Sequence, residues 1–251
     1  MNINPMPELE PLLRGLRLSG MIEHLAQRNK EAIDNKMSFT EFLATLLQDE
    51  LQRRDMRKFA ARFKKAKISP NKTLEQFDFS FNPKINQQKI KDIASCRFIN
   101  EKVPVLIVGP CGTGKSHLAQ AIAHCAVRLE IDVLFFTQTQ LFRDLQAARA
   151  IGEYDKKLQQ LIKTPLLIID DFGLKPFRSP QDEDLHELIA ERYEKAATLI
   201  TSNLDFSEWG DAFPNKLLGA ATIDRLGHGA YKVILEGNSY RNLVDTKNGK
   251  N

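Results

Sequence analysis

A phosphate-binding motif occupies eight consecutive residues, Gly109-Pro110-Cys111-Gly112-Thr113-Gly114-Lys115-Ser116. Small residues at these positions let the backbone curve so that successive N–H groups and the start of the next helix point at phosphate oxygens. Lys115 would place its charge between the β- and γ-phosphates of a nucleotide, and Ser116 would offer a hydroxyl to Mg²⁺. We therefore expect Gly109 to Ser116, with His117 directly after them, to bind a nucleoside triphosphate.

Two carboxylates end an apolar segment further along the chain, Leu166-Leu167-Ile168-Ile169-Asp170-Asp171. Ligands of open α/β sheets bind at the carboxyl ends of the strands, which is where a strand over these residues would place both acids. Asp170 is the candidate to hold Mg²⁺, directly or through water, and Asp171 the candidate to polarise an attacking water molecule. Taken alone, the pair is also consistent with a strand that ends in an acidic turn. The preceding phosphate motif favours the catalytic interpretation.

A polar triplet, Thr201-Ser202-Asn203, ends another apolar segment. If this strand lies between the strand before the phosphate motif and the acidic strand, Asn203 points at the γ-phosphate, where its amide would hold the attacking water. A simple strand end is the alternative. The guanine-reading pattern N-K-x-D is missing, because Asn215-Lys216-Leu217-Leu218 lacks the acid. ATP is therefore favoured over GTP.

Apolar segments and amphipathic segments alternate from about Thr73 onward, which predicts the elements that position these residues. Continuous apolar strands separated by helices are typical of a parallel sheet covered on both faces, so we expect an α/β fold with a five-stranded parallel sheet in a three-layer αβα core. The predicted strands are 103–108, 132–137, 166–169, 197–201 and 232–235, and the predicted helices are 115–129, 139–149, 154–163 and 182–195.

A small all-helical domain is predicted for residues 1–67, followed by a linker over 68–75 and the nucleotide-binding domain over 76–251. Ser38-Phe39-Thr40-Glu41 is a capping box that predicts a helix start. The helix would bury five apolar side chains, Phe39, Phe42, Leu43, Leu46 and Leu47. Because the apolar stripe rotates before Met56, a break or bend is expected near residues 50–55.

The net charge of the chain, +4, is confined to one short segment. Residues 53–67 carry eight basic side chains and one acidic side chain, whereas residues 76–251 carry 22 of each. A basic amphipathic helix here would release phosphate counterions on binding nucleic acid. A solvated face and a helix that binds a membrane surface or a partner are the alternatives. The candidate DNA-binding residues are Arg53, Arg54, Arg57, Lys58, Arg62, Lys64 and Lys65.

Several classes of protein are excluded by composition. The longest apolar run, 103–110, spans eight residues, against the roughly 18 that a membrane-spanning helix needs. The first residues lack the basic start and apolar core of a signal peptide. Three cysteines without a C-x-x-C pair argue against a disulfide framework or a four-cysteine zinc site. A cytoplasmic protein without membrane contact is expected.

Taken as a set, these residues resemble AAA+ ATPases of the helicase-loader clade, and within it IstB-type transposition helper ATPases. The resemblance covers nearly the whole chain. Besides the phosphate motif it rests on 73–79, Asp170-Asp171-Phe172-Gly173, Ala190-Glu191-Arg192-Tyr193-Glu194, Thr201-Ser202-Asn203, Glu208-Trp209-Gly210, Asp224-Arg225-Leu226 and Gly237-Asn238-Ser239-Tyr240-Arg241.

The resemblance implies functions that the spacing of the residues does not predict by itself. Proteins of this type assemble on DNA in an ATP-dependent way, with nucleotide between neighbouring subunits. They bind duplex DNA with little sequence preference, remodel it, recruit a partner transposase and stimulate insertion. Without the resemblance, Arg225 would be interpreted as a surface residue on a helix. The resemblance implies that Arg225 is an arginine finger that contacts the γ-phosphate bound by the neighbouring subunit. The implied catalytic set is Lys115, Asp171, Asn203 and Arg225.

Two departures from the superfamily pattern bear on turnover and assembly. Asp171 stands where the superfamily usually has Glu, and its side chain is one methylene shorter, so slow hydrolysis is expected. After the last strand about fifteen residues remain, too few for a C-terminal helical lid. Arg241 would be at best a partial substitute for the sensor arginine of such a lid.

Two other functions share the same motifs. A replicative helicase loader would use the same ATP site, with the N-terminal helices as a helicase-binding module. Residues 1–67 contain no cluster of zinc ligands, which disfavours the loaders that use one there. A P-loop kinase for a small metabolite would need a lid over its acceptor, and no segment of the sequence offers one.

Overall fold

The computed structural model describes residues 9–237 together with 239 and 240. The chain divides into two compact units, Met1–Ala61 and Arg62–Asn251. This division and the predicted end of the helical domain at residue 67 both fall near the end of helix α3 (Phe39–Ala66).

The N-terminal unit is helical and has a small core. It contains α1 (Leu9–Gly15), α2 (Ser19–Asp34) and the first part of α3. The predicted capping box begins α3, since Ser38 Oγ accepts from the Glu41 amide at 3.3 Å and the Glu41 carboxylate accepts from the Ser38 amide at 2.7 Å. The buried core consists of Leu13, Met21 and Leu46.

Two expectations for α3 are wrong. The helix runs without a break through residues 50–55, because it contains neither proline nor glycine and strongly helix-forming charged residues carry it onward. Of the five apolar side chains expected to be buried, Leu46 is buried and Phe42 packs on the core. Phe39 is 94% exposed, and Leu43 and Leu47 are about half exposed. The two shorter helices of this unit cover only one side of α3.

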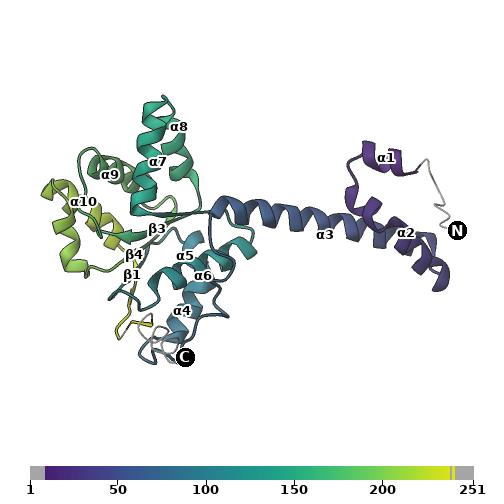
Figure 1. Cartoon of the computed structure of the whole chain (residues 1–251), viewed down its shortest axis with the longest axis horizontal. Coiled ribbons are helices and arrows are strands. Elements are labelled where there is room, and N and C mark those ends of the chain that lie inside the picture. The colour runs from purple at the N-terminus through teal and green to yellow at the C-terminus, as the bar shows by residue number, and fades with distance from the viewer. Residues whose placement is uncertain (1–8, 238, 241–251) are drawn as a thin grey trace, which may run out of the picture. The chain divides into compact units, whose positions relative to one another are not determined.

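The second unit, residues 62–251, is built on a five-stranded, all-parallel sheet, as predicted. The strands lie in the order β2-β3-β4-β1-β5, so that β4 separates β1 from β3 (Figure 1). Their bounds are β1 Val105–Val108, β2 Val133–Thr137, β3 Leu166–Phe172, β4 Ala197–Ser202 and β5 Tyr231–Ile234. This order satisfies the condition under which Asn203 would reach the γ-phosphate.

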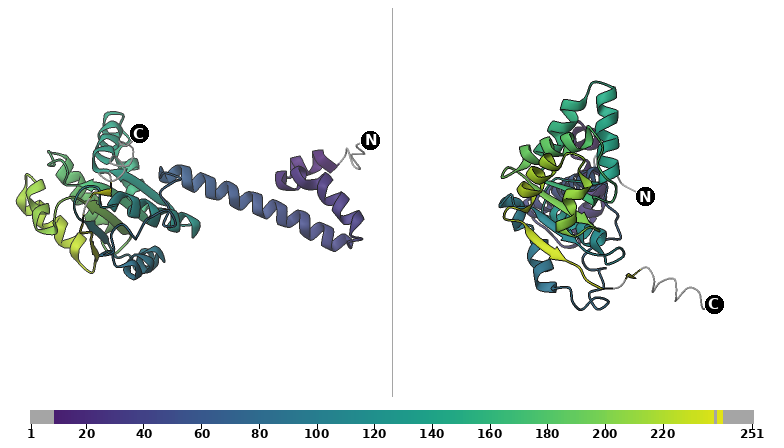
Figure 2. Two further views of the ribbon diagram at one scale, coloured as in Figure 1. Left: turned by 60° about the horizontal axis from the view of Figure 1, so that its bottom comes forward. Right: turned by 90° about the vertical axis from the view of Figure 1, so that its left-hand side faces the viewer.

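Helices cover both faces of the sheet and form two separate cores (Figures 1 and 2). One face packs on α4 (Gln87–Ala94), α5 (Arg97–Asn100) and α6 (Lys115–Arg128). The other face packs on α7, α8, α9, α10 and the 3-10 helix η1, whose bounds are Gln138–Ala150, Tyr154–Lys163, Gln181–Arg192, Lys216–Gly227 and Phe206–Ala212. Alternate residues of each buried strand supply the two cores, which explains why the strands read as continuous apolar runs.

Three short helices, α4, α5 and η1, lie outside the predicted elements. Each has at most eight residues, so none spans enough turns for a clear helical period. Side-chain caps at Asn86 and Asp205 begin α4 and η1. Most of the segment after β5, for which no helical lid is expected, lies outside the described residues. Among the helices of residues 9–237, none combines the length and apolar character needed to cross a bilayer.

Candidate functional site

The phosphate motif forms the loop between β1 and α6. Gly109 has a φ of 149°, and a side chain there would overlap the carbonyl oxygen of Leu235. Gly114 has a φ of 96°, and its missing side chain leaves room for the ring of Phe77. These glycines are therefore required both for the backbone conformation and for close packing. The loop places the amino end of α6 at its centre, where partial positive charge favours an anion.

Lys115 is the first residue of α6 and is almost fully buried. Its Nζ donates to the carbonyl oxygens of Gly109 and Pro110, both at 2.7 Å. The ammonium group is thus held inside the loop, on the oxygen atoms that surround the phosphate-binding position. A triphosphate would accept from the same ammonium group as a charged acceptor, which is stronger than a neutral carbonyl.

Asp170 connects the loop to the centre of the sheet. Its carboxylate is 4% exposed, and its Oδ1 accepts from Ser116 Oγ at 2.9 Å and from Thr201 Oγ1. Ser116 and Asp170 were predicted to share a metal ion, whereas the Thr201 contact was missed. The signal for it was present, because Thr201 lies in the polar triplet that ends β4, next to β3.

Asp171 and Asn203 line one cavity together with the phosphate loop, and this cavity has a volume of about 530 Å³. The register between β3 and β4 shifts between Ile169 and Phe172, and Asp171 has a φ of 58°. This bulge turns Asp171 out of the strand alternation. Its amide donates to Thr201 Oγ1 at 3.2 Å. The structure therefore brings Lys115, Ser116, Asp171 and Asn203 to one cavity, with Asp170 beneath it.

The far wall of this cavity was not predicted as a binding site. It is formed by Lys72, Gln76, Phe77, Asp78, Phe81 and Tyr240. Phe77 packs edge-on against His117 with ring centroids 5.3 Å apart, and Phe81 packs edge-on against Tyr240 at 4.9 Å. His117 Nε2 also lies 2.9 Å from the carbonyl oxygen of Thr73. The segment before α4 is irregular, so no periodic pattern revealed that it closes over the phosphate loop.

The oxygen atoms at this position fit a magnesium ion. Ser116 supplies a hydroxyl and Asp170 a carboxylate, which are hard donors of the kind Mg²⁺ takes in nucleotide sites. The described residues contain no group of three or more His, Cys, Asp or Glu side chains arranged as a metal cage. Mg²⁺ in such sites uses one or two protein ligands and completes its shell with phosphate oxygens and water.

Arg225 lies outside the ATP cavity. It is in α10 and lines a separate cavity of about 210 Å³ with Tyr193 and His228. Its Nη1 donates to the Ala221 carbonyl within its own helix at 3.1 Å. Burial, followed by the charge of Arg225, lowers the pKa of His186 on the neighbouring α9. The structure thus separates Arg225 from the three other candidate catalytic residues of the same copy, Lys115, Asp171 and Asn203.

Arg192 has a structural role. It is 1% exposed, and its guanidinium donates to the carbonyls of Leu161, Ile162, Thr164 and Ala197 and to Thr198 Oγ1. Burial lowers the pKa of Arg192 to about 9. These contacts join the end of α8 to the start of β4. Arg241, the suggested substitute for a lid arginine, lies outside the described residues.

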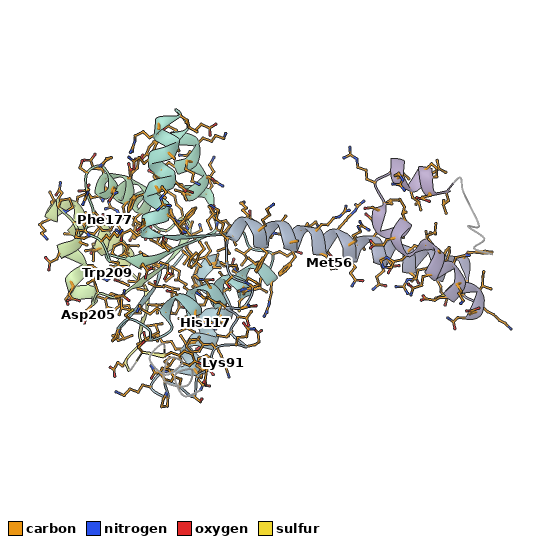
Figure 3. The ribbon with its side chains drawn as sticks, in the orientation of Figure 1. Met56, Lys91, His117, Phe177, Asp205 and Trp209 are labelled. Carbon is orange, nitrogen blue, oxygen red and sulfur yellow. The ribbon has the colours of Figure 1, made fainter. Side chains whose placement is uncertain are left out.

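Most of the predicted DNA-binding cations already form ion pairs within their own unit. In the N-terminal unit Arg53 pairs with Glu23, Arg54 with Glu50 at 2.7 Å, and Lys58 with Asp55 at 3.4 Å. In the second unit, residues 62–251, Arg62 and Lys65 pair with Asp132 at 3.5 and 2.6 Å. Within the described part of the chain, no salt bridge involves Arg57 or Lys64. Met56, on the apolar stripe between these cations, is exposed (Figure 3).

Solved structures with this fold include replication proteins. The match to DnaA of Aquifex aeolicus bound to AMPPCP has a TM-score of 0.57 and 20% identity, and covers 73% of this chain and 56% of that one. The match to the DnaC helicase loader has a TM-score of 0.55 and 23% identity, and covers 66% of this chain and 97% of that one. At these identities the likeness shows the fold alone, which is the AAA+ fold.

Sequence relatives extend over almost the whole chain. A protein of Pseudomonas aeruginosa, named for ATP binding and insertion sequence IS21, is 35% identical over 94% of this chain and 89% of its own length. A Mycobacterium tuberculosis protein, also named for ATP binding in an insertion sequence, is 34% identical over 94% of both chains. The profile of the family described as IstB-like ATP binding protein matches residues 11–248. The chain therefore belongs to the IstB-like family of insertion-sequence ATP-binding proteins.

Proposed function

We propose that the protein hydrolyses ATP while assembled on duplex DNA and that it assists the transposase of an insertion sequence. The observation that carries the proposal is the grouping of the candidate catalytic residues. Lys115, Ser116, Asp171 and Asn203 line one cavity, whereas Arg225 lines another. A site that needs Arg225 is complete only when a second copy supplies it.

ATP would bind to groups that contacts within the protein already hold in place around the phosphate loop. The phosphate-loop amides and the Lys115 ammonium would bind the β- and γ-phosphates. Ser116 and Asp170 would hold Mg²⁺, which neutralises phosphate charge when bound. The aromatic wall of Phe77 and Phe81 offers an apolar surface for the base.

Two copies of the protein would supply the residues that catalyse hydrolysis. Asp171 would accept a proton from the attacking water, and Asn203 would orient that water by a hydrogen bond. Arg225 of an adjacent copy would stabilise the charge that develops on the transferred phosphoryl group. Because Asp171 is shorter than the Glu of the wider superfamily, the carboxylate reaches less far and turnover is slow.

Replacing Asp171 with asparagine is expected to lower kcat by about 10²- to 10⁴-fold, because the amide cannot act as a general base. The affinity for ATP should change little, since the phosphate-loop amides and the Lys115 ammonium that would bind the phosphates remain in place. Steady-state hydrolysis and nucleotide titration on the same preparation measure both effects. Asp171→Glu is the control, because it keeps the carboxylate with a longer reach and should match or exceed the wild-type rate. Unchanged hydrolysis by Asp171→Asn would remove Asp171 from the mechanism.

DNA binding would use the basic segment 53–67. Arg57 and Lys64 give the cleanest test, because their removal breaks no salt bridge that the structure describes. With Arg57→Gln and Lys64→Gln combined, the slope of log K against log salt concentration should fall by about 1.8, at about 0.9 per lost phosphate contact.

Fluorescence anisotropy with a random-sequence duplex, measured over a range of KCl concentrations with ATP present, gives this slope. The matched control is Lys30→Gln combined with Lys36→Gln, which removes the same charge from exposed positions outside the segment. An equal loss of slope in both variants would show that the segment acts only through net charge.

Assistance to a transposase is supported by the family, whose members are named for insertion sequences. The test is strand insertion in vitro by the transposase whose frame adjoins that of this protein. Insertion should rise when the protein and ATP are added. Co-purification with a hexameric helicase, without stimulation of insertion, would instead identify a helicase loader.

A further inference from the structure

A second groove lies at the amino edge of the sheet, the edge that precedes the strands. It has a volume of about 710 Å³. Its basic side chains are Arg62, Lys102, Lys163 and Lys195, and its acidic side chains are Glu130 and Asp132. In a parallel sheet the phosphate loop and the acidic pair lie at the other, carboxyl edge. The groove, called the amino-edge groove below, is therefore distinct from the ATP cavity.

The cations of the amino-edge groove follow the order of the strands. Arg62 pairs with Asp132, directly before β2, and Lys163 precedes β3. Lys195 precedes β4, and Lys102 precedes β1. The sheet order β2-β3-β4-β1 thus places one cation at the start of each of four neighbouring strands. At about 4.8 Å between strands, the row extends over about 14 Å.

The row is only partly neutralised. Arg62 lies 3.5 Å from carboxylate oxygens of Glu130 and Asp132, and Lys195 pairs with Glu191 at 3.1 Å. Lys102 and Lys163 are exposed and have no salt bridge to any residue that the structure describes. Two ammonium groups of the row therefore remain for an external anion.

We propose that the amino-edge groove binds the sugar–phosphate backbone of duplex DNA, as a second contact in addition to the basic segment 53–67. The inference rests on the DNA binding proposed above and extends it to the second unit, residues 62–251. A row of cations about 14 Å long spans about four successive phosphates of one DNA strand, which repeat about every 3.4 Å. The groove is also continuous with Arg62, which belongs to the candidate DNA-binding set.

The location of the groove has a functional consequence. Since ATP and DNA would bind at opposite edges of the same sheet, neither displaces the other. Charge removal in the groove should therefore weaken DNA binding and leave the affinity for ATP unchanged. Weaker DNA binding together with unchanged affinity for ATP would distinguish an effect on the groove from an effect on the ATP cavity.

The test measures the salt dependence of duplex binding by the full chain with ATP present. Combining Lys102→Gln with Lys163→Gln should lower the slope of log K against log salt concentration by about 1.8, as expected for two lost phosphate contacts. Lys102→Arg combined with Lys163→Arg keeps both charges and should retain the wild-type slope. Lys84→Gln combined with Lys91→Gln removes an equal charge from exposed lysines before and in α4 (Lys91 in Figure 3) and is the control, with Lys84 paired to Glu236 at 3.1 Å.

Three results would overturn the proposal while wild-type protein still binds the duplex. The first is an unchanged slope in the Lys102→Gln and Lys163→Gln variant. The second is an equal fall in slope for the Lys84→Gln and Lys91→Gln control. The third is a loss of affinity for a poly-glutamate peptide with no loss for DNA, which would assign the groove to an acidic protein partner. Absence of binding by the wild-type protein would instead contradict the proposed function.

Discussion

Replacing Lys115 with alanine is expected to remove ATP binding almost completely. The ammonium group already lies 2.7 Å from two carbonyl oxygens of the phosphate loop, so it is positioned for the β- and γ-phosphates. Hydrogen bonds to charged groups contribute about 1.5–3 kcal/mol each, so the loss of two such contacts should raise the Kd for ATP by about 10²- to 10⁴-fold. Calorimetric titration with ATP and Mg²⁺ measures this change directly.

The control for Lys115→Ala is Lys91→Ala, which removes the same charge from an exposed position on α4 and should bind ATP normally. Thermal unfolding of both variants without nucleotide separates a binding defect from a folding defect. If Lys115→Ala is folded and binds ATP with wild-type affinity, the loop between β1 and α6 is not the nucleotide site.

Replacing Arg225 with alanine is expected to abolish turnover while ATP still binds. Arg225 does not line the ATP cavity of its own copy, and its hydrogen bond to Ala221 lies within α10. An arginine finger contributes about 10³- to 10⁵-fold to kcat in phosphoryl transfer, so hydrolysis should fall by that factor. ATP titration and steady-state hydrolysis at saturating DNA measure the two effects.

The control for Arg225→Ala is Arg97→Ala, which removes the same charge from an exposed position of the second unit and should retain hydrolysis. A loss of ATP affinity equal to the loss of rate would contradict the expected separation. It would mean that Arg225 supports the nucleotide site through the fold rather than through the transition state.

The phosphate loop and the sheet were predictable because their signals are local. Val105–Val108 and Ala197–Ser202 are continuous apolar strands that are buried on both faces. Gly109 and Gly114 have positive φ angles that residues with a side chain rarely adopt, so glycine at these positions indicates the loop. The positions of Asp170 and Asn203 near the phosphate loop can be predicted from the ends of their strands once the strand order is known. Periodicity did not predict this order, which entered the sequence analysis only as a condition for the role of Asn203.

The far wall of the ATP cavity was not predictable from pattern. Phe77 and Phe81 lie in an irregular segment, and they contact His117 and Tyr240 across long stretches of sequence. No spacing rule reports such contacts, because they depend on how a loop folds back over the sheet.

The error in α3 has a different cause. The rotation of its apolar stripe predicted a bend near residues 50–55, on the assumption that each apolar residue must face one core. The structure keeps the helix straight through this region and leaves Phe39, Leu43 and Leu47 exposed within a single copy. Periodicity predicts which face of a helix is apolar. It does not predict whether other residues of the same copy bury that face.

The central claim is that one active site is shared by two adjacent copies, and subunit mixing tests it most directly. Equal amounts of the Asp171→Asn and Arg225→Ala variants, both of which are expected to bind ATP, are combined on duplex DNA, and ATP hydrolysis is measured. In a head-to-tail assembly about a quarter of the sites pair an intact Asp171 with an intact Arg225, so hydrolysis should return to about a quarter of the wild-type rate. A mixture no more active than either variant alone would contradict the claim.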